Sequence, residues 1–239
     1  MTRLKKIPLL LLVLAAASAS AETAQEARIK KLIEPRMGVG IKVDSVSKTP
    51  YGGLYEVRTN GDIFYTDENA DYIVVGKIID SHTYKDLTKE RVDQLATINF
   101  ADLPLDAAVK TVKGNGKRVL AIFEDPNCPY CKNLHKTLQE IDNVTVYTFL
   151  LNILSDDSVV KSRDIWCSAD RSKAWNDWMT NGKAAAAAAP ACPTPSDKVL
   201  ALGKKLRIVG TPTVYFADGS RTGSALDAKA LEQKLASLK

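Results

Sequence analysis

Two cysteines separated by two residues, in Cys128-Pro-Tyr-Cys131, constrain this chain more than any other feature. They follow RVLAIFED at 118–125, a nearly continuous apolar run that is typical of a buried central strand. They precede NLHKTLQEI at 133–141, in which leucine and isoleucine recur with helical spacing. A Cys-x-x-Cys pair between a buried strand and a helix is typical of a redox-active dithiol in an α/β core.

The predicted position of Cys128 at a helix start explains why the pair is expected to react. Free backbone N–H groups and the positive end of the helix dipole favour a thiolate there, and such cysteines have pKa values of about 3.5–7.5. Pro129 suits the first helical turn, where no N–H is needed. Cys131 lies one turn further along, so we expect it to be the more buried and less acidic thiol.

Other uses of the Cys-x-x-Cys pair fit the sequence less well. Zinc needs four ligands, and Cys167 and Cys192 do not form a second such pair. A c-type haem needs a histidine directly after the second cysteine, where this chain has Lys132. A disulfide over so short a loop would stabilise the fold little. The prediction is therefore redox chemistry without a metal or another cofactor, and we expect His135 on the helix surface rather than as a general base.

Two further motifs accompany the pair. Gly210-Thr211-Pro212-Thr213 opens a predicted strand, and a proline there requires special geometry, such as a cis bond in a tight turn, although trans bonds are commoner. Cys167 and Cys192 flank a stretch rich in alanine and proline. In an oxidising compartment a structural disulfide is the simpler interpretation, worth roughly 3–3.5 kcal/mol. A second redox relay is the alternative.

The first 21 residues have the pattern of a secretory signal peptide. A basic start precedes an apolar run at 7–17 that is too short to span a membrane, and Ala19-Ser20-Ala21 gives a small-x-small cleavage site. The net charge of +5 becomes nearly balanced without the basic leader, which argues against a nucleic-acid partner. The mature protein is predicted to enter an oxidising compartment, where disulfides persist.

Residues 22–85 have the pattern of a small α+β domain. A short helix is expected at 24–34, followed by short runs of β-branched and aromatic residues. Turn signals such as Asn60-Gly61 separate these runs, which predicts an antiparallel sheet. A sheet with so few core residues benefits from a partner that covers its edge, so we expect dimerisation through this domain.

The rest of the chain has a different pattern. Residues 86–112 are predicted to form a helical linker whose second helix runs from 105 to 112. Residues 113–239 contain buried strands joined by a helix, which predicts an α/β core with a right-handed crossover. A helical insertion is expected at about 155–208.

These motifs together resemble the thioredoxin superfamily, and residues 22–239 resemble the DsbC/DsbG family of periplasmic disulfide isomerases. The strand, the Cys128–Cys131 pair, its helix and Thr211-Pro212 before a strand are the arrangement that the superfamily shares. The small N-terminal sheet, the linker and the insertion match the family in order and size. The resemblance implies a cystatin-like N-terminal dimerisation domain and a thioredoxin-like catalytic domain with a helical insertion.

The resemblance also implies a role for each motif. Cys128 would be the attacking cysteine and Cys131 the resolving one, while Cys167 and Cys192 would form a non-catalytic disulfide. The residues implied in substrate binding are Pro129, Tyr130, Thr211 and a cis-Pro212. The implied partners are misfolded or mis-bridged secreted proteins, a second copy bound through residues 22–85, and a membrane reductase of the DsbD kind as electron donor.

One departure from the superfamily and two alternative functions stay open. Thioredoxins carry a buried acid on the strand before the motif, where this chain has Ile122, so the nearby Glu124 is assigned no proton-transfer role. Cys-Pro-Tyr-Cys also fits a DsbG-like reductase of thiols oxidised to sulfenic acid. A chaperone or holdase whose cysteines are only structural is the alternative from another class.

Overall fold

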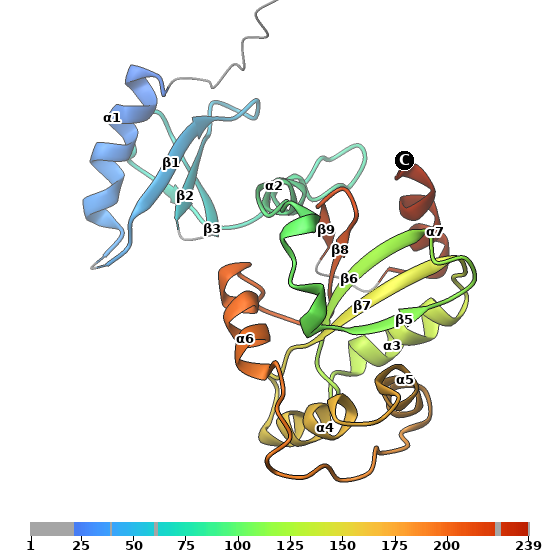
Figure 1. Ribbon diagram of the computed structural model, residues 1–239. Helices are drawn as coiled ribbons and strands as arrows, with labels where there is room; N and C mark the ends of the chain where they lie inside the picture. Colours follow the sequence, from blue (N-terminus) through green and yellow to red (C-terminus); the bar gives the residue numbers. More distant parts are fainter. Residues whose placement is uncertain (1–21, 39, 60–61, 223–225, 239) are drawn as a thin grey trace, which may run out of the picture. The chain divides into compact units, whose positions relative to one another are not determined.

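The computed structural model describes residues 22–38, 40–59, 62–222 and 226–238. The predicted signal peptide and the Asn60-Gly61 turn lie outside these residues. The chain divides into two compact units, Met1–Gly76 and Lys77–Lys239, each with its own sheet (Figure 1). The division falls before the predicted boundary at residue 85.

The first unit packs one helix against an antiparallel sheet. Helix α1 (Ala24–Ile33) begins at Thr23, whose side chain forms a capping box with Glu26. Its buried residues Ile29 and Ile33 pack on a core that the strands supply. In sheet order the strands are β1 (Val43–Lys48), β2 (Tyr55–Thr59), β3 (Asp62–Thr66) and β4 (Ile73–Val74). The predicted α+β domain is therefore confirmed, with β4 at one edge of the sheet.

The second unit contains a mixed sheet with the order β5-β7-β6-β8-β9. Strands β6 and β7 are parallel and are joined by helix α3, while the other neighbours are antiparallel. The strands are β5 (Val109–Val112), β6 (Arg118–Glu124), β7 (Val144–Leu150), β8 (Thr213–Phe216) and β9 (Arg221–Thr222). The predicted α/β core is confirmed.

Helices cover both faces of this sheet (Figure 1). Helices α3 (Pro129–Gln139) and α7 (Ala228–Ser237) pack their leucines on one face of β6 and β7. Helix α6 (Ser196–Lys205) packs on the other face. Helices α4 (Asp156–Trp166) and α5 (Arg171–Asn181) belong to the helical insertion, and α5 contacts α3 and β5. None of the helices in the described residues has the length and apolar character that a membrane crossing needs.

The prediction of a second helix from 105 to 112 is wrong. After α2 (Leu87–Leu95), the chain makes short 3-10 turns at Phe100–Asp102 and Leu105–Ala107 and then continues as β5. Strand β5 pairs along the edge of β7, with Val109 buried. The β-branched sequence VKTV suits that edge, and pairing with β7 overrides the helical spacing of its apolar residues.

The segment that follows α2 belongs to the second unit and packs on the turn between β8 and β9. The N–H of Ile98 donates to the carbonyl of Gly219, at 3.0 Å, in the turn between β8 and β9. Gly219 has φ +79°, and a Cβ there would lie 1.8 Å from the carbonyl oxygen of Ile98. Only glycine therefore fits at this contact.

Candidate active site

Cys128 and Cys131 are free thiols at the start of α3, and both are buried. Cys128 is the N-cap of this helix, and the backbone N–H of Cys131 donates to its Sγ at 3.4 Å. Pro129 and Tyr130 between them are exposed, with 68% of the Tyr130 side chain open to solvent. The fold therefore presents the pair where a buried strand meets a helix N-terminus.

The Thr211-Pro212 segment lies against Cys128 although it is distant in the sequence. The Sγ of Cys128 donates to the carbonyl of Thr211 at 3.2 Å. The Thr211–Pro212 peptide bond is cis, and β8 begins directly after it. Strand β8 pairs with β6, which leads into Cys128, so sheet pairing brings the two motifs together.

Glu124 at the end of β6 is a fully buried carboxyl group close to Cys131. Burial raises the pKa of Glu124 to about 8. The Thr148 side chain has the opposite, smaller effect on this pKa. Burial likewise raises the pKa of the Cys131 thiol, and the charge of Glu124 raises it further. Two coupled acids therefore lie beneath the reactive end of α3.

From the sequence, Glu124 is assigned no proton-transfer role because the usual position of the buried acid holds Ile122, two residues earlier. Residues two apart on a strand point to the same face, so Ile122 and Glu124 both face α3. Glu124 lies nearer the end of β6 where α3 begins, and so it reaches Cys131. An acidic residue at the end of an otherwise apolar buried strand is the sequence signal that favours a functional role for it.

Comparison with known proteins decides the family. Residues 105–239 match the family model of a thioredoxin-like domain, and residues 19–89 match that of the disulfide bond isomerase protein N-terminal domain. A "Probable thiol:disulfide interchange protein DsbC" from Bordetella pertussis is 48% identical over 91% of this chain and 77% of its own length. This chain belongs to the DsbC family of thiol:disulfide interchange proteins.

Two other relatives agree with this assignment. The "Thiol:disulfide interchange protein DsbC" of Escherichia coli K12 is 28% identical over 91% of this chain and 89% of its own length. A crystal structure of a disulfide interchange protein from Neisseria gonorrhoeae is 37% identical, with a TM-score of 0.54. It covers 56% of this chain and 96% of that one.

In this DsbC-family chain the second cysteine pair is oxidised. Cys167 and Cys192 form a disulfide with a Cα–Cα distance of 6.5 Å, linking the end of α4 to the segment before α6. The helical insertion also supplies Trp166 and Trp175, which pack in one buried cluster with the two free cysteines. Some of the core beneath the redox pair of this DsbC-family chain therefore comes from the insertion.

His135 is buried, so the prediction of a helix-surface histidine is wrong for this DsbC-family chain. Helix α5 covers that face of α3, and the His135 Nε2 lies 3.0 Å from Asn176 Oδ1. Burial lowers the pKa of His135.

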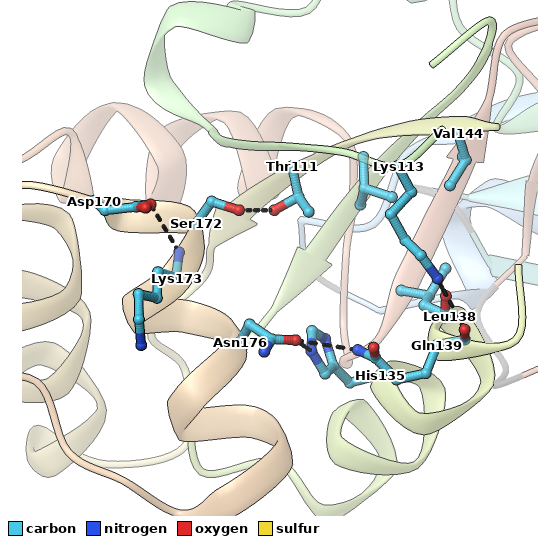
Figure 2. A pocket seen from close by; sticks show the side chains of 11 residues that line it. Thr111, Lys113, His135, Leu138, Gln139, Val144, Asp170, Ser172, Lys173 and Asn176 are labelled. Atoms are coloured by element: carbon cyan, nitrogen blue, oxygen red, sulfur yellow. Dashed lines mark hydrogen bonds between the residues drawn. The ribbon is translucent and has the colours of Figure 1, made fainter. Parts of the chain in front are cut away.

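Figure 2 shows His135 and Asn176 in the wall of a cavity of about 350 Å³. Hydrogen bonds tie its walls together, from Thr111 on β5 to Ser172 on α5 and from Lys113 to the last carbonyls of α3. None of the residues that line it belongs to the Cys128–Cys131 pair or the Thr211-Pro212 segment. The polar side chains that line this cavity therefore hold β5, α3 and α5 together.

Proposed function

We propose that this protein reshuffles wrong disulfides in secreted proteins, with Cys128 as the nucleophile and Cys131 as the resolving thiol. The supporting observation is the arrangement at the start of α3. The sulfur of Cys128 lies at the helix N-terminus and faces a backbone N–H, while Cys131 is buried beneath it. This asymmetry suits one thiol that meets the client and one that acts afterwards.

The reaction begins when the Cys128 thiolate attacks one sulfur of a client disulfide. A mixed disulfide between Cys128 and the client forms, and the second client sulfur leaves as a thiolate. When another client thiolate attacks the mixed disulfide, Cys128 leaves as a thiolate and the client holds a new disulfide. No electrons are gained or lost overall, so isomerisation requires the pair to start reduced.

The second route releases a client that does not rearrange. The Cys131 thiol loses its proton and attacks the Sγ of Cys128, and the client sulfur leaves. The client gains two electrons, and the Cys128–Cys131 disulfide forms. An external dithiol must then reduce the pair, and we assign this task to a membrane reductase of the DsbD kind.

Glu124 is the group that we assign to the Cys131 proton. The buried Cys131 thiol ionises reluctantly, and the Glu124 carboxyl is coupled to it in the same buried region. With a pKa of about 8, Glu124 can take up and return a proton near neutral pH.

The surface around Cys128 is the proposed client groove. The Thr211 carbonyl lies beside the Cys128 sulfur, and cis-Pro212 follows it. Pro129 and Tyr130 are exposed at the helix start, and Tyr130 supplies an open aromatic ring. A polar backbone acceptor beside an exposed ring suits an unfolded client chain, which offers both N–H groups and apolar side chains.

A homodimer through the first unit completes the proposal. Strand β4 lies at the edge of its sheet. The two residues of β4 and the residue on each side of it in the sequence carry exposed apolar side chains. These are Tyr72, Ile73, Val74 and Val75, of which Tyr72 is 72% and Val75 84% exposed. An open apolar edge of this kind can pair with the same edge of a second copy. We place the dimer in the periplasm, to which the leader pattern would direct it.

Trapping tests the enzyme assignment. Cys131→Ala should accumulate mixed disulfides with secreted proteins, because the resolving thiol is missing. Cys128→Ala should form none and should lose the ability to reactivate scrambled ribonuclease. Reactivation by Cys128→Ala would contradict the proposal, and a lack of trapped clients in Cys131→Ala would favour the holdase. Activity on a sulfenylated thiol without reactivation of ribonuclease would favour the reductase.

A further inference from the structure

Asp125 is a fully buried acidic residue that the mechanism above does not use. It lies between β6 and the cysteine pair, and its backbone carbonyl accepts the N–H of Cys128 at 3.0 Å. Its carboxyl group therefore lies at the base of the turn that carries the nucleophile.

Four donors converge on the carboxyl group of Asp125. Oδ1 accepts the Asn127 N–H at 2.9 Å and the Ser158 hydroxyl at 2.7 Å. Oδ2 accepts the N–H groups of Ile153 and Leu154 at 3.0 and 3.1 Å. Four donors fill the acceptor sites of a carboxylate, so the surrounding residues are arranged to bind this carboxyl group.

These donors come from two separate parts of the second unit. Asn127 belongs to the turn itself, whereas Ile153 and Leu154 follow β7 and Ser158 lies in the first turn of α4. The carboxyl group of Asp125 therefore joins the turn before Cys128 to the start of the helical insertion.

The two residues that follow Asp125 bind the insertion as well. The carbonyl of Pro126 accepts the indole N–H of Trp178 on α5 at 2.7 Å. The side-chain amide of Asn127 donates to Asp157 Oδ2 at 2.7 Å and to the Ser158 hydroxyl at 3.1 Å. Each residue from Asp125 to Asn127 thus has a hydrogen bond to α4 or α5.

We propose that Asp125 is a positioning residue through which the helical insertion determines the reactivity of Cys128. The proposal rests on the assignment of Cys128 as the nucleophile. The sulfur of Cys128 reaches the N–H of Cys131 and the carbonyl of Thr211 only while the preceding turn keeps its place. When a contact of Asp125 is lost, the turn shifts, the sulfur loses its donor and less thiolate forms.

Two serines of α4 provide a matched test. Ser158 and Ser162 are both buried, and each hydroxyl donates one hydrogen bond to a side-chain oxygen. Ser158 contacts Asp125, whereas Ser162 contacts Asn152. Ser158→Ala also removes the hydrogen bond that the Asn127 amide donates to the Ser158 hydroxyl, so it loosens the turn at two points. Ser162→Ala removes a buried hydrogen bond from the same helix and leaves the turn intact.

The experiment follows iodoacetamide alkylation of Cys128 in the full reduced chain, across pH, by mass spectrometry. In Ser158→Ala we expect the pH midpoint to rise and the rate below that midpoint to fall by at least about 2- to 10-fold, the range that each lost hydrogen bond spans. Asp125→Asn should shift the profile further, because an amide nitrogen cannot accept the N–H groups. In Ser162→Ala the profile should match wild type.

Three results bear on the proposal. Equal profiles for Ser158→Ala and Ser162→Ala, at equal losses of thermal stability, would overturn the positioning role. If Asp125→Asn fails to fold, the serine pair still decides. If Cys128 in wild type is alkylated no faster than Cys131, the assignment of the nucleophile fails, which is a different outcome from equal serine variants.

Discussion

Two consecutive acidic residues at the end of β6 have opposite surroundings. Glu124 and Asp125 are both fully buried, yet successive residues of an extended chain point to opposite sides. Asp125 meets four hydrogen-bond donors. Glu124 faces α3 and Cys131, where burial raises its pKa to about 8. One carboxyl group is thereby suited to holding structure and the other to moving a proton.

Glu124→Gln should slow the release of clients without slowing the attack on them. In wild type, attack of Cys131 on the mixed disulfide should accelerate with pH, with a midpoint near 8, as Glu124 ionises. The amide cannot accept a proton, so release at pH 8 should fall roughly 100-fold or more. Rapid-quench measurement of a preformed mixed disulfide reports this rate. Alkylation of Cys128 serves as the control, and an unchanged release profile would exclude Glu124 from the step.

The same substitution should change how stability depends on pH. The pKa of Glu124 is raised from 4.5 to about 8 in the folded state. The stability that this group contributes is complete below about pH 4.5 and is lost as pH rises through 8. Urea unfolding should therefore show wild type losing up to roughly 3–5 kcal/mol relative to Glu124→Gln across this range. Parallel curves for the two proteins would contradict the buried, neutral state of Glu124.

At the scale of elements, the segment after α2 is part of the second unit. Ile98 pairs with Gly219, and Arg221 Nε on β9 lies 3.8 Å from a carboxylate oxygen of Asp93 on α2. The helical insertion is equally integrated, because it packs under the cysteine pair and binds the turn before it. Both segments therefore contribute to the surroundings of the thioredoxin-like sheet.

Gly219→Ala should destabilise the contact between this segment and the turn of β8 and β9. The new Cβ would overlap the carbonyl of Ile98, and φ +79° disfavours alanine. We expect a loss of roughly 1–3 kcal/mol in urea unfolding. Gly76→Ala is the matched control, since nothing lies within 4 Å of a Cβ there and its φ is not positive. Equal stability of the two variants would show that the contact with Ile98 does not form.

At the scale of the whole molecule, the chain consists of two compact units with different features. The first has an open apolar sheet edge, and the second contains both cysteine pairs. We therefore expect the oligomeric state and the thiol chemistry to respond to different substitutions.

The double variant Tyr72→Lys/Val75→Lys should convert the dimer to a monomer, because charge at the sheet edge opposes pairing. Light scattering after size exclusion measures the mass. Val159→Lys/Val160→Lys, at exposed apolar residues of the second unit, is the control and should leave the mass unchanged. Alkylation of Cys128 should be the same in both. A dimer that survives the first substitution would place the interface elsewhere.

Local sequence patterns determine much of the secondary structure of this protein. The apolar run before Cys128, the helical spacing after Cys131 and the strand after Pro212 predicted the α/β core, because each pattern depends on contacts close in sequence. Residues 105–112 were misassigned because the open edge of β7, which they pair with, is distant in the chain. His135 was misplaced for the same reason, since α5 covers it from a later segment.

The amino-acid sequence alone therefore determined the chemistry, namely which residues carry sulfur and that one pair begins a helix after a buried strand. Only the tertiary structure decided what surrounds that pair. It placed the Thr211 carbonyl beside Cys128, Glu124 near Cys131, and the start of α4 on Asp125. The physical reason is that hydrogen bonding and desolvation depend on distance in space, and the groups that touch the redox pair come from strands and helices far apart in the chain.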